Sequence, residues 1–210
     1  DPASKGSCFL GGNIAENSGG PKAVKYGVVQ DYVLNLEVVL PDGNIIWTGA
    51  NVLKNATGYN LTQLLIGSEG TLGIVTKIVF KIIPKPMQDV LMLVPFHKLE
   101  DACRSVKDIF HTGITPSGLE LMEKDAILYA MKFIGESPFE VSKETEAQLL
   151  IELDGNNIDL LMKECEKIVQ VLEKYDCSDI LFADNTKQKE DLWKLRRSVG
   201  EAVKAQSIYK

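Results

Sequence analysis

The sequence predicts an α+β protein made of two regions that differ in texture. Residues 1–86 are rich in Gly, Asn, Val and Ile, and turn signals separate their short apolar runs. Residues 87–210 alternate apolar runs with longer charged segments of helical spacing. Pro84 and Pro86 end the last run of the first region, so we place the domain boundary there.

The first region contains a predicted β-hairpin and one later strand. Residues 35–40 (NLEVVL) and 44–48 (NIIWT) are strand candidates, and Pro41-Asp42-Gly43 between them is a strong turn signal. Residues 60–66 have a short helical pattern. Residues 74–83 (IVTKIVFKII) form a β-branched run that alternates partly in period two, which predicts a strand.

The second region predicts four strands separated by helices. Apolar runs predict the strands, and apolar residues at helical spacing predict the helices between and after them. In chain order these are strand 90–96, helix 99–112, strand 118–122, helix 124–133, strand 147–153, helix 158–174, strand 180–183 and helix 186–205. The order is typical of a ferredoxin-like α+β layer.

Composition excludes several classes of protein. The net charge of −6 gives no indication of a basic face, so we expect no nucleic-acid partner. No apolar run reaches the roughly 18 residues of a membrane span, and the first residues lack a signal-peptide pattern. The 4 cysteines form no C-x-x-C pair and are interpreted as reduced thiols. We therefore expect a cytoplasmic protein.

The stretch GGNIAENSGG, residues 11–20, is the most informative local feature. It matches neither the dinucleotide fingerprint nor a Walker loop. Its Gly-Gly pairs can still expose successive backbone N–H groups as an anion nest, with Asn13, Asn17 and Ser18 as side-chain donors. A tight glycine loop without a ligand is the competing interpretation, and the local sequence leaves both open. GSEGTLG, residues 67–73, has the same character.

Together the glycine segments resemble a known family. GGNIAENSGGPKAVKYGVVQDYVLNLEVVLPDG and GYNLTQLLIGSEGTLGIVTKIVFKIIPKP resemble the FAD-dependent 2-hydroxy acid dehydrogenases, which include the glycolate oxidase flavin subunit, D-lactate dehydrogenases and D-2-hydroxyglutarate dehydrogenases. The resemblance implies the second half of a vanillyl-alcohol-oxidase-type FAD-binding domain over residues 1–86. It implies the first part of a ferredoxin-like substrate (cap) domain over residues 87–210.

The resemblance also implies which residues contact FAD. In the family, the glycine-rich segment lies along the pyrophosphate and the isoalloxazine, and the strand after GTLG reaches the cofactor mainly through its backbone. Backbone donors suit a pyrophosphate, and glycine permits close approach. By position, the implied cofactor-binding residues are Gly11, Gly12, Asn13, Asn17, Gly19, Gly20, Gly27, Ile74 and Val75.

Near the end of the chain, DLWKLRRSVGEAVKAQSIYK carries the implied substrate contacts. In the family, a Leu-Trp-x-x-Arg helix holds an arginine that grips the substrate carboxylate, and by match this is Arg196. A lysine that follows a tyrosine also reaches the substrate, and Lys210 after Tyr209 fits. Arginine suits the task because its planar fork binds a carboxylate bidentately. A solvated helix face is the competing interpretation for Arg196.

Two family motifs lie outside the sequence. An arginine- and glycine-rich pyrophosphate loop would precede it, and a His-x-x-Asp-Gly-Asn-x-His motif with metal ligands and the catalytic base would follow it. The histidines present, His97 and His111, stand near no Asp-Gly-Asn. We therefore expect no catalytic base and no metal ligand in this chain. We interpret it as an internal fragment that is inactive alone, of an enzyme that can hold a divalent metal.

The implied activity is oxidation of a D-2-hydroxy acid to the 2-oxo acid by hydride transfer to FAD. The implied electron acceptor is an electron-transfer flavoprotein, a quinone or oxygen, and unpaired strand edges would favour a homodimer. Two alternatives stay open. One is another enzyme on the same scaffold, of the aryl-alcohol or alkyl-glycerone-phosphate type. The other is a cofactor-free interaction domain, against which the glycine pairs argue.

Overall fold

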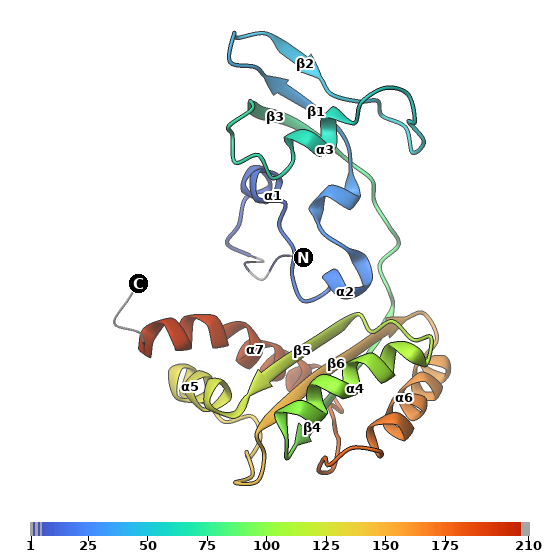
Figure 1. The fold of residues 1–210 in the computed structure, drawn as a ribbon, viewed down its shortest axis with the longest axis vertical. Helices are drawn as coiled ribbons and strands as arrows, with labels where there is room; N and C mark the ends of the chain where they lie inside the picture. Colours follow the sequence, from blue (N-terminus) through green and yellow to red (C-terminus); the bar gives the residue numbers. More distant parts are fainter. Residues whose placement is uncertain (1, 3, 5, 207–210) are drawn as a thin grey trace. The chain divides into compact units, whose positions relative to one another are not determined.

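The protein divides into two compact units, Asp1–Lys85 and Pro86–Lys210, each described here by itself. The structure is a computed structural model and describes Pro2, Ser4 and residues 6–206 (Figure 1). Among these residues, no helix is both long and apolar enough to cross a membrane.

A three-stranded antiparallel sheet of order β2-β1-β3 organises the first unit. The strands are β1 (Val33–Val39), β2 (Ile45–Trp47) and β3 (Ile74–Phe80). The predicted hairpin is confirmed, and Gly43 supplies the positive φ of its turn at +83°. The strand predicted over 74–83 ends at Phe80 because Phe80 pairs with Val33, where β1 begins.

Short helices complete the first unit. They are α1 (Leu10–Glu16), α2 (Ala23–Tyr26), the 3-10 helix η1 (Val29–Tyr32) and α3 (Leu61–Leu65). Helix α1 corrects the sequence analysis, which left an anion nest and a ligand-free loop open for residues 11–20 and predicted no helix there. Ile14 is fully buried in the core of this unit, and its packing outweighs the low helix propensity of Gly11 and Gly12.

A four-stranded antiparallel sheet of order β5-β6-β4-β7 organises the second unit. The strands are β4 (Gln88–Phe96), β5 (Gly118–Glu123), β6 (Ala147–Gly155) and β7 (Leu181–Phe182). The first and third strands of this unit are central and the second and fourth lie at the edges. This is the ferredoxin-like arrangement that the sequence predicted.

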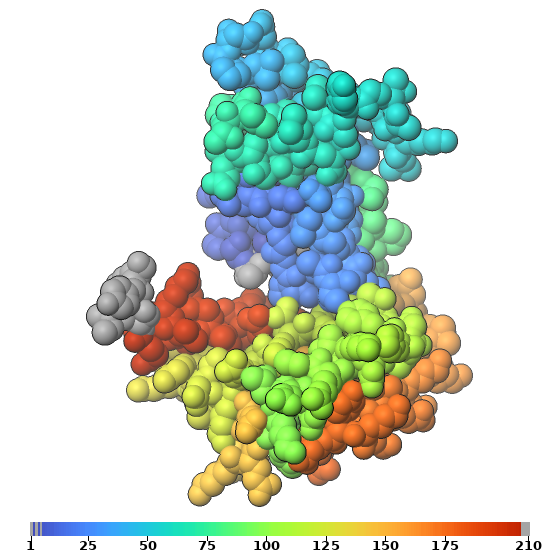
Figure 2. Space-filling model, viewed as in Figure 1, coloured from blue at the N-terminus to red at the C-terminus, as the bar shows by residue number. Residues whose placement is uncertain are grey.

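Helices cover both faces of this sheet. They are α4 (Leu99–His111), α5 (Lys124–Ile134), α6 (Ile158–Leu172) and α7 (Thr186–Gln206). Helices α4 and α6 pack on one face and α5 and α7 on the other, with a separate apolar core on each side. In Figure 2 the green surface of α4 lies beside the orange surface of α6. Since both faces of β4 and β6 are covered, both strands are apolar almost throughout.

Candidate functional site

In the first unit, the two glycine-rich segments meet at the C-terminal end of α1. The Ile14 carbonyl accepts a hydrogen bond from the Gly67 N–H at 2.9 Å, and the Ala15 carbonyl accepts from the Glu69 N–H at 3.1 Å. Gly67 has φ +78° and Glu69 has φ +52°, so the second segment bends sharply as it joins the helix. The structure thus brings together two segments that are about 50 residues apart in sequence.

Asn13 and Asn17 use their side chains to hold this segment in place. Asn17 ends α1 with φ 51°, and its amide donates to Gln30 Oε1 at 2.9 Å and accepts from the Gln30 N–H at 3.0 Å. The side-chain oxygen Oδ1 of the buried Asn13 accepts from Ser18 Oγ at 3.2 Å. The amide of Asn13 lies 3.6 Å from Cys8 Sγ, and this hydrogen bond lowers the pKa of the Cys8 thiol. These contacts assign both asparagines a supporting role, while their predicted flavin contacts stay predictions.

The packing of the chain itself requires glycine at position 27 and leaves little room for a side chain at position 19. Gly27 has φ +74°, and a Cβ there would lie 2.1 Å from Asp31 Oδ2. That oxygen accepts the Val28 N–H at 2.7 Å, so a side chain at Gly27 would break the turn. A Cβ on Gly19 would lie 3.0 Å from Val28 Cγ1. The Gly20 carbonyl accepts from the Ala23 N–H at 2.8 Å and begins the next turn.

Gly11 and Gly12 have no such requirement. Both are exposed within α1, and a Cβ on either would meet no atom of the described chain within 4 Å. Each costs about 1 kcal/mol of helix stability relative to Ala. A flat ring or a pyrophosphate that presses against the helix would account for this cost, because a Cβ would fill the space it needs. These residues therefore fit a nucleotide cofactor such as FAD.

The predicted pair on β3 points to opposite sides. Ile74 is 61% exposed, whereas Val75 packs against the core of Ile14 and Leu36. The alternation is the ordinary period of a strand. Of these two predicted contacts, Ile74 is the one whose side chain is available at the surface.

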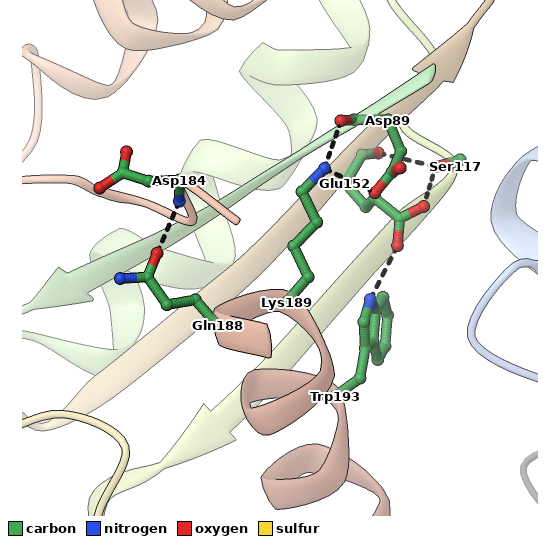
Figure 3. A network of polar contacts seen from close by, with 7 residues as sticks. All are labelled: Asp89, Ser117, Glu152, Asp184, Gln188, Lys189 and Trp193. Carbon is green, nitrogen blue, oxygen red and sulfur yellow. Dashed lines mark hydrogen bonds and ion pairs between the residues drawn. The ribbon is translucent and has the colours of Figure 1, made fainter. Parts of the chain in front are cut away.

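In the second unit, one face of α7 is fastened to the sheet by carboxylates (Figure 3). Lys189, Trp193 and Arg196 lie within an arc of about 60° on this helix. Lys189 Nζ donates to the Asp89 carbonyl at 2.6 Å and lies 3.0 Å from Asp89 Oδ2. The helix starts where Asn185 Oδ1 accepts the Gln188 N–H at 3.0 Å, an N-cap contact that fixes its register.

Arg196, the predicted substrate ligand, is paired with Glu120 of β5. Arg196 Nε donates to Glu120 Oε2 at 2.8 Å, and Nη2 lies 2.5 Å from the same oxygen. Because its guanidinium is paired with Glu120, Arg196 is not the freely solvated helix residue that the competing interpretation described. Lys210, the other predicted substrate ligand, lies outside the described residues.

Trp193 rests on a glycine and reaches a buried carboxyl. Its Nε1 donates to Glu152 Oε2 at 2.8 Å, and Ser117 Oγ donates to Glu152 Oε1 at 3.1 Å. Glu152 is 3% exposed. The indole carbons lie 3.1 Å from the position of a Cβ on Gly118, so the glycine makes room for the ring. Trp193 and its neighbour Arg196 are therefore held from two adjacent strands.

A second polar arrangement lies at the far end of β4. His97 Nδ1 lies 2.7 Å from Asp176 Oδ1, and His97 Nε2 lies 2.8 Å from Ser178 Oγ. The spacing resembles a serine hydrolase triad. However, the Ser178 N–H donates to the Pro95 carbonyl and the Cys177 N–H to the Tyr175 carbonyl, so neither serves as an oxyanion donor. The arrangement fastens β4 to the turn before β7.

Sequence reasoning missed the carboxylates that hold α7. Glu120 and Glu152 stand in the apolar strands GLELME and AQLLIELDG, where a charged residue on a covered face needs a partner. That signal was readable in the sequence. Their partners on α7 are 76 and 41 residues away, and no local pattern identifies them.

Two family descriptions match the chain. Residues 85–209 match "FAD linked oxidases, C-terminal domain", and residues 1–49 match "FAD binding domain". A D-lactate dehydrogenase of Anaerostipes hadrus is 40% identical over 99% of this chain and 44% of its own length. The glycolate oxidase subunit GlcD of Bacillus subtilis is 38% identical over 97% of this chain and 42% of its own. The chain thus spans less than half the length of these relatives.

Solved structures share the fold. An alkyldihydroxyacetonephosphate synthase superposes with a TM-score of 0.71 at 21% identity, covering 94% of this chain and 38% of the synthase chain. At this identity the likeness supports the fold alone, and it agrees with the predicted vanillyl-alcohol-oxidase-type architecture.

Proposed function

Because the chain belongs to the family of FAD-linked oxidases, we propose that it forms part of an enzyme that oxidises a D-2-hydroxy acid to the 2-oxo acid. Relatives named D-lactate dehydrogenase and glycolate oxidase, at 40% and 38% identity, support the reaction class. The alternative of an alkyl-glycerone-phosphate type of enzyme is supported by likeness of fold only.

The first unit would hold the cofactor. Gly11 and Gly12 would let the flavin nucleotide approach the α1 backbone, and Gly19, Gly20 and Gly27 would shape the adjoining turns. Asn13 and Asn17 would keep the segment rigid through their contacts with Ser18 and Gln30. Ile74 and Val75 would contribute the β3 side of the site. FAD supplies the two-electron oxidising power that no protein side chain has.

The second unit would hold the substrate. Arg196 would bind the substrate carboxylate, since Glu120 already fixes its guanidinium and leaves donors for a second partner. Lys210 would add a second positive charge. The base that takes the hydroxyl proton, and any divalent metal, would come from parts of the enzyme beyond this sequence. Among the described residues, no group of His, Cys, Asp and Glu is arranged to bind a metal.

The exposed glycines of α1 carry this proposal, and flavin binding tests it. The full-length protein is purified and its visible spectrum recorded before and after incubation with FAD and removal of excess. We expect a retained flavin band, and reduction of a dye acceptor with D-lactate or glycolate. A full-length protein that folds but retains no FAD would support a cofactor-free domain instead. An electron-transfer flavoprotein, a quinone and oxygen are then compared as acceptors.

A further inference from the structure

We propose that a diagonal row of carboxylates on the sheet of the second unit positions Arg196, and that the buried Glu152 is the central positioning residue of this row. The row consists of Asp89 of β4, Glu152 of β6 and Glu120 of β5. The inference rests on the proposed function, because it concerns how the sheet holds Arg196 for a substrate carboxylate.

The pairing register of the sheet places these carboxylates on a diagonal. Strand β6 lies between β4 and β5. Asp89 pairs with Asp154 of β6, Glu120 pairs with Leu150 of β6, and Glu152 lies midway between these two positions. From each strand to the next, the row therefore moves two residues along β6. Because residues two apart on a strand point to the same face, all three carboxylates face α7.

Helix α7 follows the same diagonal. Lys189 Nζ lies 3.0 Å from a carboxylate oxygen of the first member, Asp89. One turn later, Trp193 Nε1 donates to the middle member at 2.8 Å. Three residues further, Arg196 Nε donates to the last member at 2.8 Å. Each successive donor thus meets the next strand, and a shift of the helix by one residue would turn all three donors away by about 100°.

The middle contact is the most buried of the three. Glu152 is 3% exposed, whereas the side chains of Glu120 and Asp89 are 17% and 47% exposed. The buried Ser117 donates its Oγ to Glu152 Oε1 at 3.1 Å and its N–H to the Glu152 carbonyl at 2.7 Å. Ser117 thus holds one carboxylate oxygen, and the other oxygen meets the indole of Trp193 (Figure 3).

Apolar packing alone would not select this alignment of α7. The buried apolar residues of the helix are Leu192, Leu195 and Ala202, and apolar attraction is not directional. A buried carboxylate gains little or no stability over an apolar residue of similar size. We therefore assign Glu152 a role in directing α7, because hydrogen bonds to defined atoms distinguish one rotation of the helix from another.

The direction of the Arg196 guanidinium follows from this contact. Residues three apart on a helix lie about 4.5 Å apart along the axis and about 60° apart around it, so Trp193 and Arg196 leave α7 on the same face. At the end of the row, Glu120 Oε2 contacts both Nε and Nη2 of Arg196. The edge formed by Nη1 and Nη2 is then turned in one direction, and such an edge suits a bidentate carboxylate.

The first test replaces Glu152 in the full-length flavoenzyme. Glu152→Met keeps a similar volume but removes both carboxylate oxygens, whereas Glu152→Gln can accept from the indole and donate to Ser117. We measure KM for D-lactate and kcat per bound flavin. We expect Glu152→Met to raise KM about tenfold, the factor of 1.4 kcal/mol, at nearly constant kcat, because a carboxylate contact acts on substrate and transition state alike.

The glutamine variant should keep KM within about threefold of wild type. Equal KM values in the methionine and glutamine variants would overturn the inference, because the hydrogen bonds of Glu152 would then not matter to substrate binding. A lower kcat at constant KM in Glu152→Met would overturn it as well.

Two further variants separate positioning from a general effect on folding. Trp193→Phe removes the donor on the helix side of the same bond and should raise KM as Glu152→Met does, so a wild-type KM would contradict the proposal. Glu136→Gln changes the partner of Lys194, which lies outside the row, and should keep the wild-type KM. In an Arg196→Lys background, Glu152→Met should raise KM less than about twofold further, whereas effects that multiply would show that Glu152 acts independently of Arg196.

A chemical measurement distinguishes this inference from the proposed function. Phenylglyoxal modifies accessible guanidinium groups, and tandem mass spectrometry gives separate rates for Arg196 and the exposed Arg197 in the full-length protein. Glu152→Met should speed the modification of Arg196 several-fold and leave that of Arg197 unchanged. An unchanged Arg196 rate would overturn the inference. If no hydroxy acid is oxidised, the proposed function fails, and these rates still decide whether Glu152 directs Arg196.

Discussion

Trp193 Nε1 donates to Glu152 Oε2 over 2.8 Å, and this bond joins the middle of α7 to a central strand of the sheet. Glu152 is 3% exposed, so its carboxyl depends on donors from the protein. Ser117 Oγ supplies another donor to the opposite oxygen. Arg196 lies three residues after Trp193 on α7. We therefore expect that loss of the Trp193–Glu152 bond would also change the position of the Arg196 side chain.

Replacing Trp193 by Phe should destabilise the second unit. The ring stays over Gly118 but the indole N–H is lost, and leaving a buried polar group without a hydrogen-bond partner costs about 1–3 kcal/mol. Urea denaturation of the chain, followed by circular dichroism, measures the change in the free energy of unfolding. Glu136→Gln, at an exposed carboxylate that pairs with Lys194 of the same helix, should leave the midpoint unchanged. A wild-type midpoint for Trp193→Phe would show that Glu152 does not need this donor.

Gly12→Ala should have opposite effects on stability and on flavin binding. The new methyl meets open space in the described chain and improves helix propensity, so the free energy of unfolding without flavin should rise by about 0.5–1 kcal/mol. The same methyl should lower FAD affinity about tenfold or more if a cofactor presses against α1.

Gly200→Ala is the matched control for this experiment. Gly200 also lies inside a helix with open space at its Cβ position, so the substitution should stabilise α7 and leave FAD affinity unchanged. The dissociation constant of FAD is measured by flavin fluorescence in the full-length protein. Unchanged affinity in Gly12→Ala would remove the observation on which the proposed flavin site rests.

The first and the second unit of the protein differ in how much of their structure the sequence predicts. Every predicted strand and helix of the second unit is present, because burial on both sheet faces leaves long apolar runs and the helices have strong periodicity. Helix α1 was missed because glycine has a low helix propensity, and only the packing of Ile14 reveals why it is helical. Glu120 and Glu152 were missed as partners of α7 because only the arrangement of the helix on the sheet brings these distant residues together.

Arg196→Lys should weaken substrate use while leaving the fold intact. Lysine keeps the charge but loses the planar fork that contacts Glu120 and that, in the proposed function, also binds the substrate carboxylate. We expect kcat/KM for D-lactate to fall about tenfold to a hundredfold, which corresponds to about 1.4–2.7 kcal/mol. Arg197→Lys, at the exposed neighbouring position, should keep wild-type kinetics. Equal losses in both variants would mean that the helix surface as a whole, and not Arg196, sets the activity.

The stability of the second unit should fall at alkaline pH through Cys165. Burial, with a smaller effect of the neighbouring Glu164 charge, raises the pKa of the Cys165 thiol from 9.0 to about 11. Between these values the unfolded chain releases the thiol proton and the folded protein keeps it, so the unfolded state binds fewer protons. The free energy of unfolding therefore decreases as pH rises through this range, by at most about 1.4 kcal/mol per pH unit, and is unaffected well below pH 9.

Cys165→Val isolates this effect from the titration of other groups. Urea denaturation under reducing conditions is compared for wild type and variant at about pH 8 and about pH 10, and the wild type should lose more stability between the two. Ile168→Val, one turn further along α6 and fully buried, removes a methylene without removing a titrating group. Its deficit relative to wild type should be the same at both pH values. A pH-independent difference for Cys165→Val would mean that the buried thiol titrates alike in the folded and unfolded states.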